Sequence, residues 1–114
     1  MPLRRWIRVS SYEEARKFEG CVYVLKKNGR PIYVGKAKRF GGSGGRYAHG
    51  YSYLLDELLA SRRYSLHLLR LSDYSNEAGD YEGTLISKAK GAGYDLRNAR
   101  IPANFERIKY LRLP

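Results

Sequence analysis

The alternation of apolar and polar positions in the first forty residues predicts one short helix and a β-hairpin. Residues 11–14 (SYEE) have the form of a capping box, so a helix is expected to begin there and to end at Gly20. Residues 21–26 (CVYVLK) and 31–35 (PIYVG) are rich in β-branched and aromatic residues and flank an Asn-Gly pair, which is typical of a hairpin. The second strand begins with proline, which cannot donate to a β-ladder, so this strand is expected at a sheet edge.

The remaining pattern predicts two longer helices and one more strand. A glycine-rich run, GGSGG (41–45), precedes a single apolar helical stripe. Residues 64–71 (YSLHLLRL) are expected to form the third strand, and a helix is expected from residue 76 to residue 90, with glycines directly after it. The tail should add a short strand or pack irregularly. The stripe consists of Tyr47, Tyr51, Leu54, Leu55, Leu58 and Leu59.

Taken in order, these elements predict an α+β fold with a small three-stranded antiparallel β-sheet flanked by helices. The length of 114 residues suits one domain, and no repeat, linker or low-complexity tail divides it. We therefore expect a single domain over residues 1–114.

The hairpin register decides whether the two strand tyrosines share a face. A two-residue Asn28-Gly29 turn would place Tyr23 opposite Val34 and leave Tyr33 on the other face. A three-residue loop with Gly29 as a bulge would place Tyr23 directly opposite Tyr33, with about 5 Å between their Cβ atoms. Both loops fit the sequence.

The charge of the chain points to a polyanionic partner. There are 22 Lys and Arg against 11 Asp and Glu, a net charge of +11. The excess is uneven, because residues 1–50 hold 12 basic and 3 acidic side chains and no acid lies between Glu19 and Asp56. A field of one sign over one region attracts nucleic acid, so this partner is favoured over a merely solubilising surface.

The sequence also indicates where the protein works. The first twenty residues lack the apolar core and cleavage site of a signal peptide, and no segment has the apolar length of a membrane span. Cys21 is the only cysteine, which excludes an internal disulfide and a cysteine-based zinc finger. We expect an intracellular protein, cytoplasmic or nucleoid-associated, with no membrane partner.

Several polar residues in the predicted elements have the chemistry of phosphodiester cleavage. Tyr33 is followed by Val-Gly and then Lys36, a later helix start carries Arg46, and the last helix carries Glu82. A carboxylate can hold a hard divalent ion, a phenol can orient water, and cations can stabilise the charge that develops on a pentacovalent phosphate.

These residues resemble the signature of the GIY-YIG endonucleases. Cys21-Val22-Tyr23 and Tyr33-Val34-Gly35 are similar to its paired triplets, and the resemblance covers about residues 20–98. The run VYVLKKNGRPIYVGKAKR is especially similar to the nuclease module of the bacterial excision-repair incision subunits. The resemblance implies a three-stranded sheet with one shallow site that binds Mg²⁺ or Mn²⁺ and hydrolyses double-stranded or branched DNA.

The resemblance also implies a role for each matched residue. Tyr23 would orient water or act as general base, Tyr33 would support the nucleophile or the scissile phosphate, and Glu82 would bind the metal. Phosphate and DNA contacts would come from the basic and amide side chains, and a histidine near the arginine would be a further catalytic candidate. These are Lys36, Lys38, Arg39, Arg46 and Asn98 for the contacts, and His49 for the histidine.

The sequence departs from the family pattern at several places. Cys21 stands where glycine is usual, and Arg46 lies eleven residues after Gly35 instead of about eight, which the GGSGG run would explain. The alternatives to the matched residues are Arg39 for Arg46, Glu77 for Glu82 and Asn104 for Asn98. His67, inside a predicted strand, is expected to be structural.

The sequence thus predicts a metal-dependent DNA endonuclease with a Tyr/Tyr/Arg/Glu site. The alternative is a catalytically silent nucleic-acid-binding module on the same scaffold. A third interpretation is a basic domain that binds RNA structurally, which a preference for RNA without metal-dependent nicking would favour.

Overall fold

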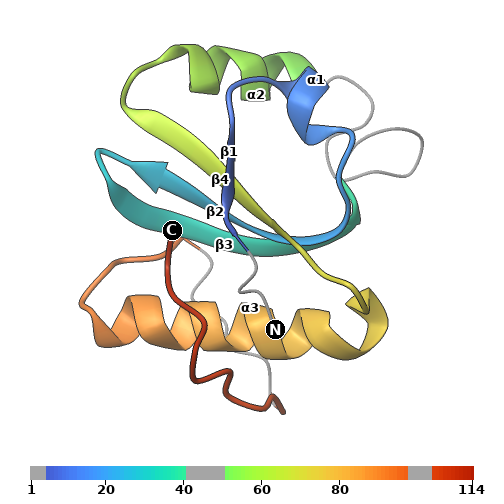
Figure 1. Cartoon of the computed structure of the whole chain (residues 1–114). Coiled ribbons are helices and arrows are strands. Elements are labelled where there is room, and N and C mark those ends of the chain that lie inside the picture. Colours follow the sequence, from blue (N-terminus) through green and yellow to red (C-terminus); the bar gives the residue numbers. More distant parts are fainter. Residues whose placement is uncertain (1–4, 41–50, 98–103) are drawn as a thin grey trace.

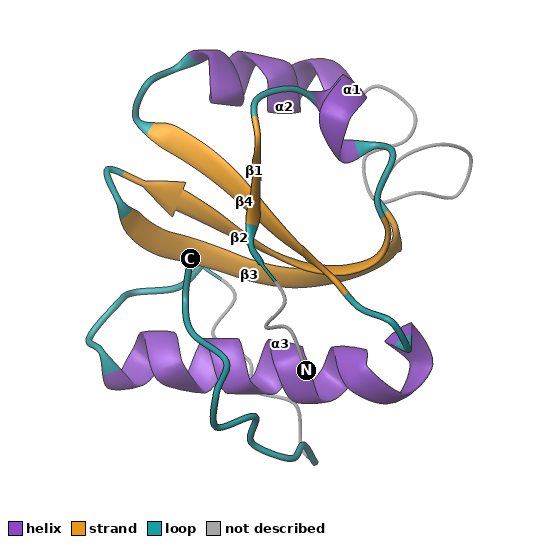
Figure 2. Cartoon of the chain, viewed as in Figure 1, coloured by secondary structure: helices purple, strands orange, loops and turns teal. Residues whose placement is uncertain are grey.

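A four-stranded antiparallel sheet lies between two helical layers in the computed structural model of the protein (Figure 1). The structure describes residues 5–40, 51–97 and 104–114, with the backbone alone for residues 51–54. The short helices α1 and α2 cover one face of the sheet and the long helix α3 covers the other (Figures 1 and 2). The elements are β1 (Ile7–Val9), α1 (Tyr12–Ala15), β2 (Glu19–Lys27), β3 (Arg30–Arg39), α2 (Tyr51–Ala60), β4 (Tyr64–Arg70) and α3 (Tyr74–Gly91).

The α+β class is confirmed, but the predicted strand count was wrong. The strand order is β1-β4-β2-β3, and the additional strand β1 pairs with β4 at the edge opposite β3. β1 has only three residues, of which one is buried. This is too short a run for an alternation of apolar and polar positions to indicate a strand in the sequence. No helix of the described residues is both long and apolar enough to cross a membrane.

The first helix begins where the capping box predicts but ends earlier. The Ser11 hydroxyl accepts a hydrogen bond from the Glu14 backbone N–H at 3.3 Å. The helix ends at Ala15, and Gly20 does not terminate it: Gly20 lies inside β2 at a φ of +63°. The other predicted helices and the third strand are present, and the GGSGG run with Tyr47 lies outside the described residues.

The hairpin combines a two-residue turn with a bulge, so neither predicted register holds along its length. Asn28 and Gly29 both have positive φ, 52° and 77°, as a type I′ turn requires. Lys26 pairs with Pro31, whereas Leu25 pairs with Tyr33, so Ile32 is an extra residue on β3. The Ile32 carbonyl accepts a hydrogen bond from the Arg97 backbone N–H at 2.7 Å, which gives the bulge a partner.

Two hydrophobic cores fill the space on either side of the sheet. The core beneath α3 contains Val22, Val24, Val34 and Leu69 from the sheet with Leu85 and Ile86 from the helix, all of them buried. The core beneath α1 and α2 contains Tyr23, Phe18, Phe40 and Leu68. Because side chains alternate along a strand, residues 22, 24, 34 and 36 face α3 and residues 21, 23 and 33 face α1 and α2.

The C-terminal tail, residues 104–114, packs irregularly across α3, one of the two predicted outcomes (Figure 1). The Ile108 N–H donates to the Thr84 hydroxyl at 3.0 Å, and the Glu106 N–H donates to the Asp80 carboxylate at 2.9 Å. Phe105 lies so close to α3 that a Cβ at Gly83 would stand 2.5 Å from its ring. The tail therefore contributes to the fold of the α3 layer.

Candidate active site at the edge of strand β3

The two signature tyrosines lie together on the face of the sheet that α1 and α2 cover. Leu25 is the residue opposite Tyr33, so Tyr23 and Tyr33 are diagonal neighbours on one face. Their rings stack with centroids 5.9 Å apart and an interplanar angle of 16°. Phe40 meets the Tyr23 ring edge-on at 5.3 Å. The bulge at Ile32 shifts the register so that Tyr23 and Tyr33 are diagonal neighbours, an arrangement that neither of the two predicted registers would give.

The second triplet ends in glycine because the ring of Tyr23 occupies the space that a side chain at residue 35 would need. Gly35 is the direct cross-strand partner of Tyr23, and a Cβ there would stand 2.5 Å from both Cζ and the hydroxyl oxygen of Tyr23. The phenol of Tyr23 therefore lies flat over the backbone of β3, where only a glycine leaves room. This brings the hydroxyl of a residue on an inner strand to the sheet edge.

Tyr23 and Tyr33 differ in their access to solvent. Tyr23 is 1% exposed and its hydroxyl is buried, whereas Tyr33 is only partly buried. Of the two phenols, Tyr33 has the greater access to a substrate.

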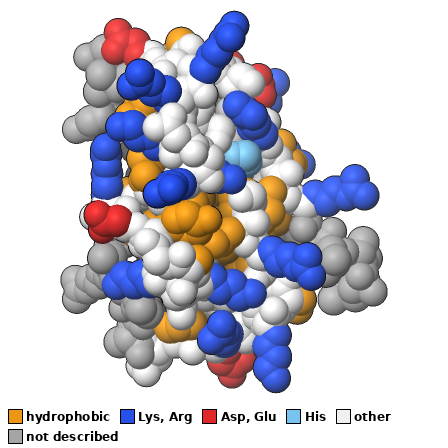
Figure 3. Space-filling model, turned by 90° about the vertical axis from the view of Figure 1, so that its left-hand side faces the viewer, with side chains coloured by type: hydrophobic (Ala, Val, Ile, Leu, Met, Phe, Trp, Pro, Cys, Tyr) orange, Lys and Arg blue, Asp and Glu red, His pale blue; other side chains and the backbone are white. Residues whose placement is uncertain are grey.

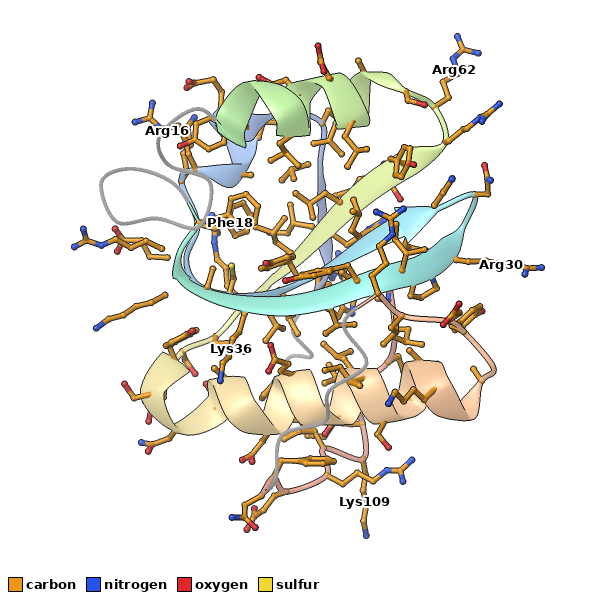
Figure 4. The ribbon with its side chains drawn as sticks, turned by 180° about the vertical axis from the view of Figure 1, so that it is seen from behind. Arg16, Phe18, Arg30, Lys36, Arg62 and Lys109 are labelled. Carbon is orange, nitrogen blue, oxygen red and sulfur yellow. The ribbon has the colours of Figure 1, made fainter. Side chains whose placement is uncertain are left out.

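Lys36 and Glu82 belong to the opposite face of the sheet. Lys36 pairs with Val22 and extends from β3 toward α3, as Figure 4 shows. Glu82 is half-buried on α3, one turn from Ala78 on one side and from Ile86 on the other, both of which pack in the core beneath the helix. Glu82 is thus placed on the side of α3 that approaches the sheet.

A site that uses both sets of residues has to lie over the outer edge of β3. Tyr33 and Lys36 come from opposite faces of this strand, and β3 is the last strand of the sheet. An inner strand would separate the two groups by a continuous sheet. At the edge strand, no further strand of the described residues separates the two faces.

Glu77, the alternative to Glu82, has a capping role at the start of α3. The Glu77 carboxylate accepts hydrogen bonds from the Asp73 backbone N–H at 2.7 Å and from the Ser72 hydroxyl at 3.2 Å. These contacts satisfy groups at the N-terminus of α3, which is a structural role. Glu82 remains the candidate of the pair for a metal ligand.

The cations of the candidate site follow β3 toward its C-terminal end. Lys38 and Arg39 are exposed, and Arg39 pairs with Glu19 at the last position of the ladder. Arg46, His49 and Asn98 lie outside the described residues, so the choice between Arg39 and Arg46 stays a prediction. Asn104 lies on the tail, beside Asp80 and Phe105.

The donor set suits a divalent ion that shares its ligands with the substrate. Within residues 5–40, 51–97 and 104–114, no three His, Cys, Asp or Glu side chains gather as a metal-binding group. Mg²⁺ commonly keeps several waters and takes one or two carboxylates together with substrate phosphates. Glu82 would supply one carboxylate for that mode.

Phe40 is a neighbour of the site that the sequence analysis missed. It follows the basic run KAKR and its position against Tyr23 depends on the bulge, so only the correct register could have identified it.

Burial shifts the pKa of two other titratable groups of the sheet. Burial raises the pKa of the Cys21 thiol to about 12, with Arg70 acting weakly in the other direction. Burial, together with Lys26 and Arg8, lowers the pKa of His67 to about 4, and the His67 ring is 2.9 Å from the Ser65 hydroxyl. These surroundings fit the predicted structural role of His67.

Comparison with protein-family models, with curated proteins and with solved structures found no match.

Proposed function

We propose that the protein is a metal-dependent endonuclease of the GIY-YIG type that hydrolyses DNA phosphodiester bonds at the outer edge of β3. The observation that carries the proposal is the unit formed by Tyr23, Gly35 and Tyr33. The glycine admits the Tyr23 phenol over the edge strand, and the stacked Tyr33 ring lies beside it. This packing gives the spacing of the two triplets a physical reason.

The charge around this unit supports an anionic substrate. β3 carries Arg30, Lys36, Lys38 and Arg39 and no acidic residue. The end of the molecule with the β2–β3 turn also shows mainly Lys and Arg side chains around a small apolar area (Figure 3). Such a surface attracts the phosphates of DNA before any base is read.

Each residue of the site has a distinct task in the proposed reaction. A divalent ion bound by Glu82 and substrate oxygens would supply Lewis-acid polarisation of the scissile phosphate. Tyr33 accepts a hydrogen bond from the attacking water and orients it, or donates one to a phosphate oxygen, and Lys36 offsets the charge that develops on the phosphate. Tyr23 holds the Tyr33 ring in place by stacking against it. Water forms the new P–O bond and loses a proton to solvent, while the bond to the leaving sugar oxygen breaks and this oxygen takes up a proton from solvent.

The test is cleavage of supercoiled plasmid by the full chain, with Mg²⁺ or Mn²⁺ and with EDTA. Wild type is expected to convert the plasmid to nicked circles only with metal. Glu82→Gln keeps the volume but removes the charge, and is expected to lower the rate at least about 100-fold with DNA binding retained. Glu57→Gln, at an exposed glutamate of α2, is the matched control and should cut like wild type.

The phenols are tested by removing their hydroxyls. Tyr33→Phe keeps the stacked ring and is expected to lower the cleavage rate about tenfold or more, since the hydrogen bond is lost. A Glu82→Gln protein that cuts at the wild-type rate would refute the proposal. Binding without metal-dependent cutting on plasmid, flap and junction substrates would identify a silent binding module.

A further inference from the structure

A second candidate site lies toward the β1 edge of the sheet, opposite β3, where the C-terminal tail crosses α3. It is a pocket of about 390 Å³ lined by Trp6, Leu69, Tyr81, Lys109, Tyr110, Leu111 and Arg112. This volume lies within the range of small-ligand sites. The active-site proposal uses none of these residues.

The aromatic side chains of the pocket are held in fixed positions. The Trp6 indole N–H donates to the Arg112 carbonyl at 2.8 Å. The hydroxyls of Tyr81 and Tyr110 are 3.1 Å apart, and Tyr81 is buried in the core beneath α3. Tyr110 is 62% exposed, one of only two large hydrophobic side chains exposed among the described residues. The pocket therefore presents a supported aromatic ring to solvent.

The positive charge of the lining suits a ligand that carries a phosphate next to an aromatic ring. Lys109 and Arg112 are exposed, and the lining contains no acidic side chain. Lys109 extends into solvent on the side of α3 away from the sheet (Figure 4). Aromatic rings interleaved with cations are the pattern on which single-stranded nucleic acids stack their bases, because every base has a π-face.

We infer that this pocket binds an unpaired nucleotide of the DNA substrate, with its base against Tyr110 and Trp6 and its phosphate near Lys109 and Arg112. The inference rests on the proposed function, since it takes nucleic acid as the substrate. A base in a duplex is stacked on its neighbours and cannot enter such a pocket. The inference therefore defines the substrate class as DNA that carries an unpaired strand.

The position of the pocket sets how far the unpaired nucleotide lies from the bond that is cut. Trp6 precedes β1, at one edge of the sheet, whereas the candidate active site lies at β3, the other edge. Three strand spacings of about 4.8 Å separate these edges, roughly 15 Å across the sheet alone. Because the tail residues of the pocket lie across α3, outside the sheet (Figure 4), a substrate with duplex at β3 and an unpaired strand at least about 15 Å from the cut would occupy both sites.

The only tryptophan of the chain makes the pocket directly observable. Trp6 fluorescence is followed while the full chain is titrated with an oligothymidylate of about 12 nucleotides and, separately, with an abasic strand of equal length. The thymidylate is expected to quench Trp6 and to bind at least about fivefold more tightly than the abasic strand, because stacking of one base supplies that factor.

Matched variants assign the effect to the pocket. Tyr110→Ala should weaken thymidylate binding about fivefold or more, whereas Tyr110→Phe keeps the ring and should stay within about twofold of wild type. Arg112→Ala should weaken binding more than Arg62→Ala, an exposed arginine beyond α2 (Figure 4). Circular-dichroism melts establish that each variant is folded.

The outcomes separate this inference from the nuclease proposal. Equal quenching by the abasic strand, or unchanged binding by Tyr110→Ala, overturns the inference. Metal-dependent nicking of plasmid without any Trp6 response also overturns it while the nuclease proposal stands. Quenching that depends on Tyr110, in a protein that cuts no plasmid, flap or junction, supports the pocket and removes the nuclease proposal.

Discussion

Replacing Gly35 with alanine tests the packing on which the candidate site depends. The new Cβ would stand 2.5 Å from Cζ and the hydroxyl oxygen of Tyr23 and 2.9 Å from Cε1. The Tyr23 ring cannot move away easily, because it is 1% exposed and lies between Tyr33 and Phe40. The substitution therefore overpacks the core beneath α1 and α2.

Two opposing contributions set the size of the effect. Overpacking a close-packed core costs about 1–3 kcal/mol. Alanine in place of glycine gains about 0.4–1 kcal/mol through the unfolded chain, since the φ of Gly35 is one that alanine adopts without strain. The first contribution is larger, so Gly35→Ala is expected to lower the free energy of unfolding by about 1–2 kcal/mol. The melting temperature should fall by about 4–8 °C.

Urea unfolding of three variants measures this effect with its controls. Gly79→Ala places a Cβ on α3 with no heavy atom within 4 Å, and is expected to stabilise by about 0.5–1 kcal/mol. Gly35→Ala combined with Tyr23→Ala removes the clash, so the alanine at residue 35 should be neutral or stabilising in that background. The reasoning is refuted if Gly35→Ala alone leaves stability unchanged or raises it.

Three further predictions concern the tail, the half-buried His67 and the cysteine. Gly83→Ala is expected to destabilise by about 0.5–2 kcal/mol, because its Cβ would stand 2.5 Å from the ring of Phe105 and this overpacking outweighs the helix gain of about 0.5–1 kcal/mol; urea unfolding should show this loss beside the gain of Gly79→Ala, and equal effects would contradict it. Burial lowers the pKa of His67 to about 4 from an ordinary value near 6.5, so the folded state favours the neutral ring and stability is lost as pH falls from about 6.5 to 4. The His67 loss should be on the order of 1 kcal/mol once solvent screening of a partly exposed ring is included, and His67→Gln should flatten the pH profile of unfolding in this window. Burial raises the pKa of Cys21 to about 12, so a thiol reagent at pH 7.5 should label it only after unfolding; rapid labelling of the folded chain would contradict this.

Local chemistry made most of the fold predictable from the sequence. The capping residues at Ser11 and Glu14 and the turn residues Asn28 and Gly29 act within a few positions, so their structures follow from the sequence. The bulge at Ile32 could not be predicted, because its carbonyl is satisfied by Arg97, sixty-five positions later in the numbering.

The residues of the candidate site stay a prediction, whereas their arrangement could not be predicted. Tyr23, Tyr33, Lys36 and Glu82 are candidates because the sequence around them resembles a known motif. Their division between the two faces of the sheet follows from the register and from the edge position of β3. The aromatic pocket combines Trp6 with the last residues of the chain, and no local pattern indicates such a pairing.

The basic charge of β3 suits both a protected sheet edge and the proposed substrate. An exposed edge strand invites pairing with another chain, and proteins prevent this with charged side chains or proline. Lysine is the charged side chain most used for this protection. β3 has Pro31 near its start, four basic side chains and no acid, so its composition meets this need, and the same positive charge would attract the phosphates of the proposed substrate. Under the proposed function, Tyr33 and Lys36 would act on one substrate from opposite faces of this strand. The position of β3 at the edge thus joins the structural need to the proposed chemistry.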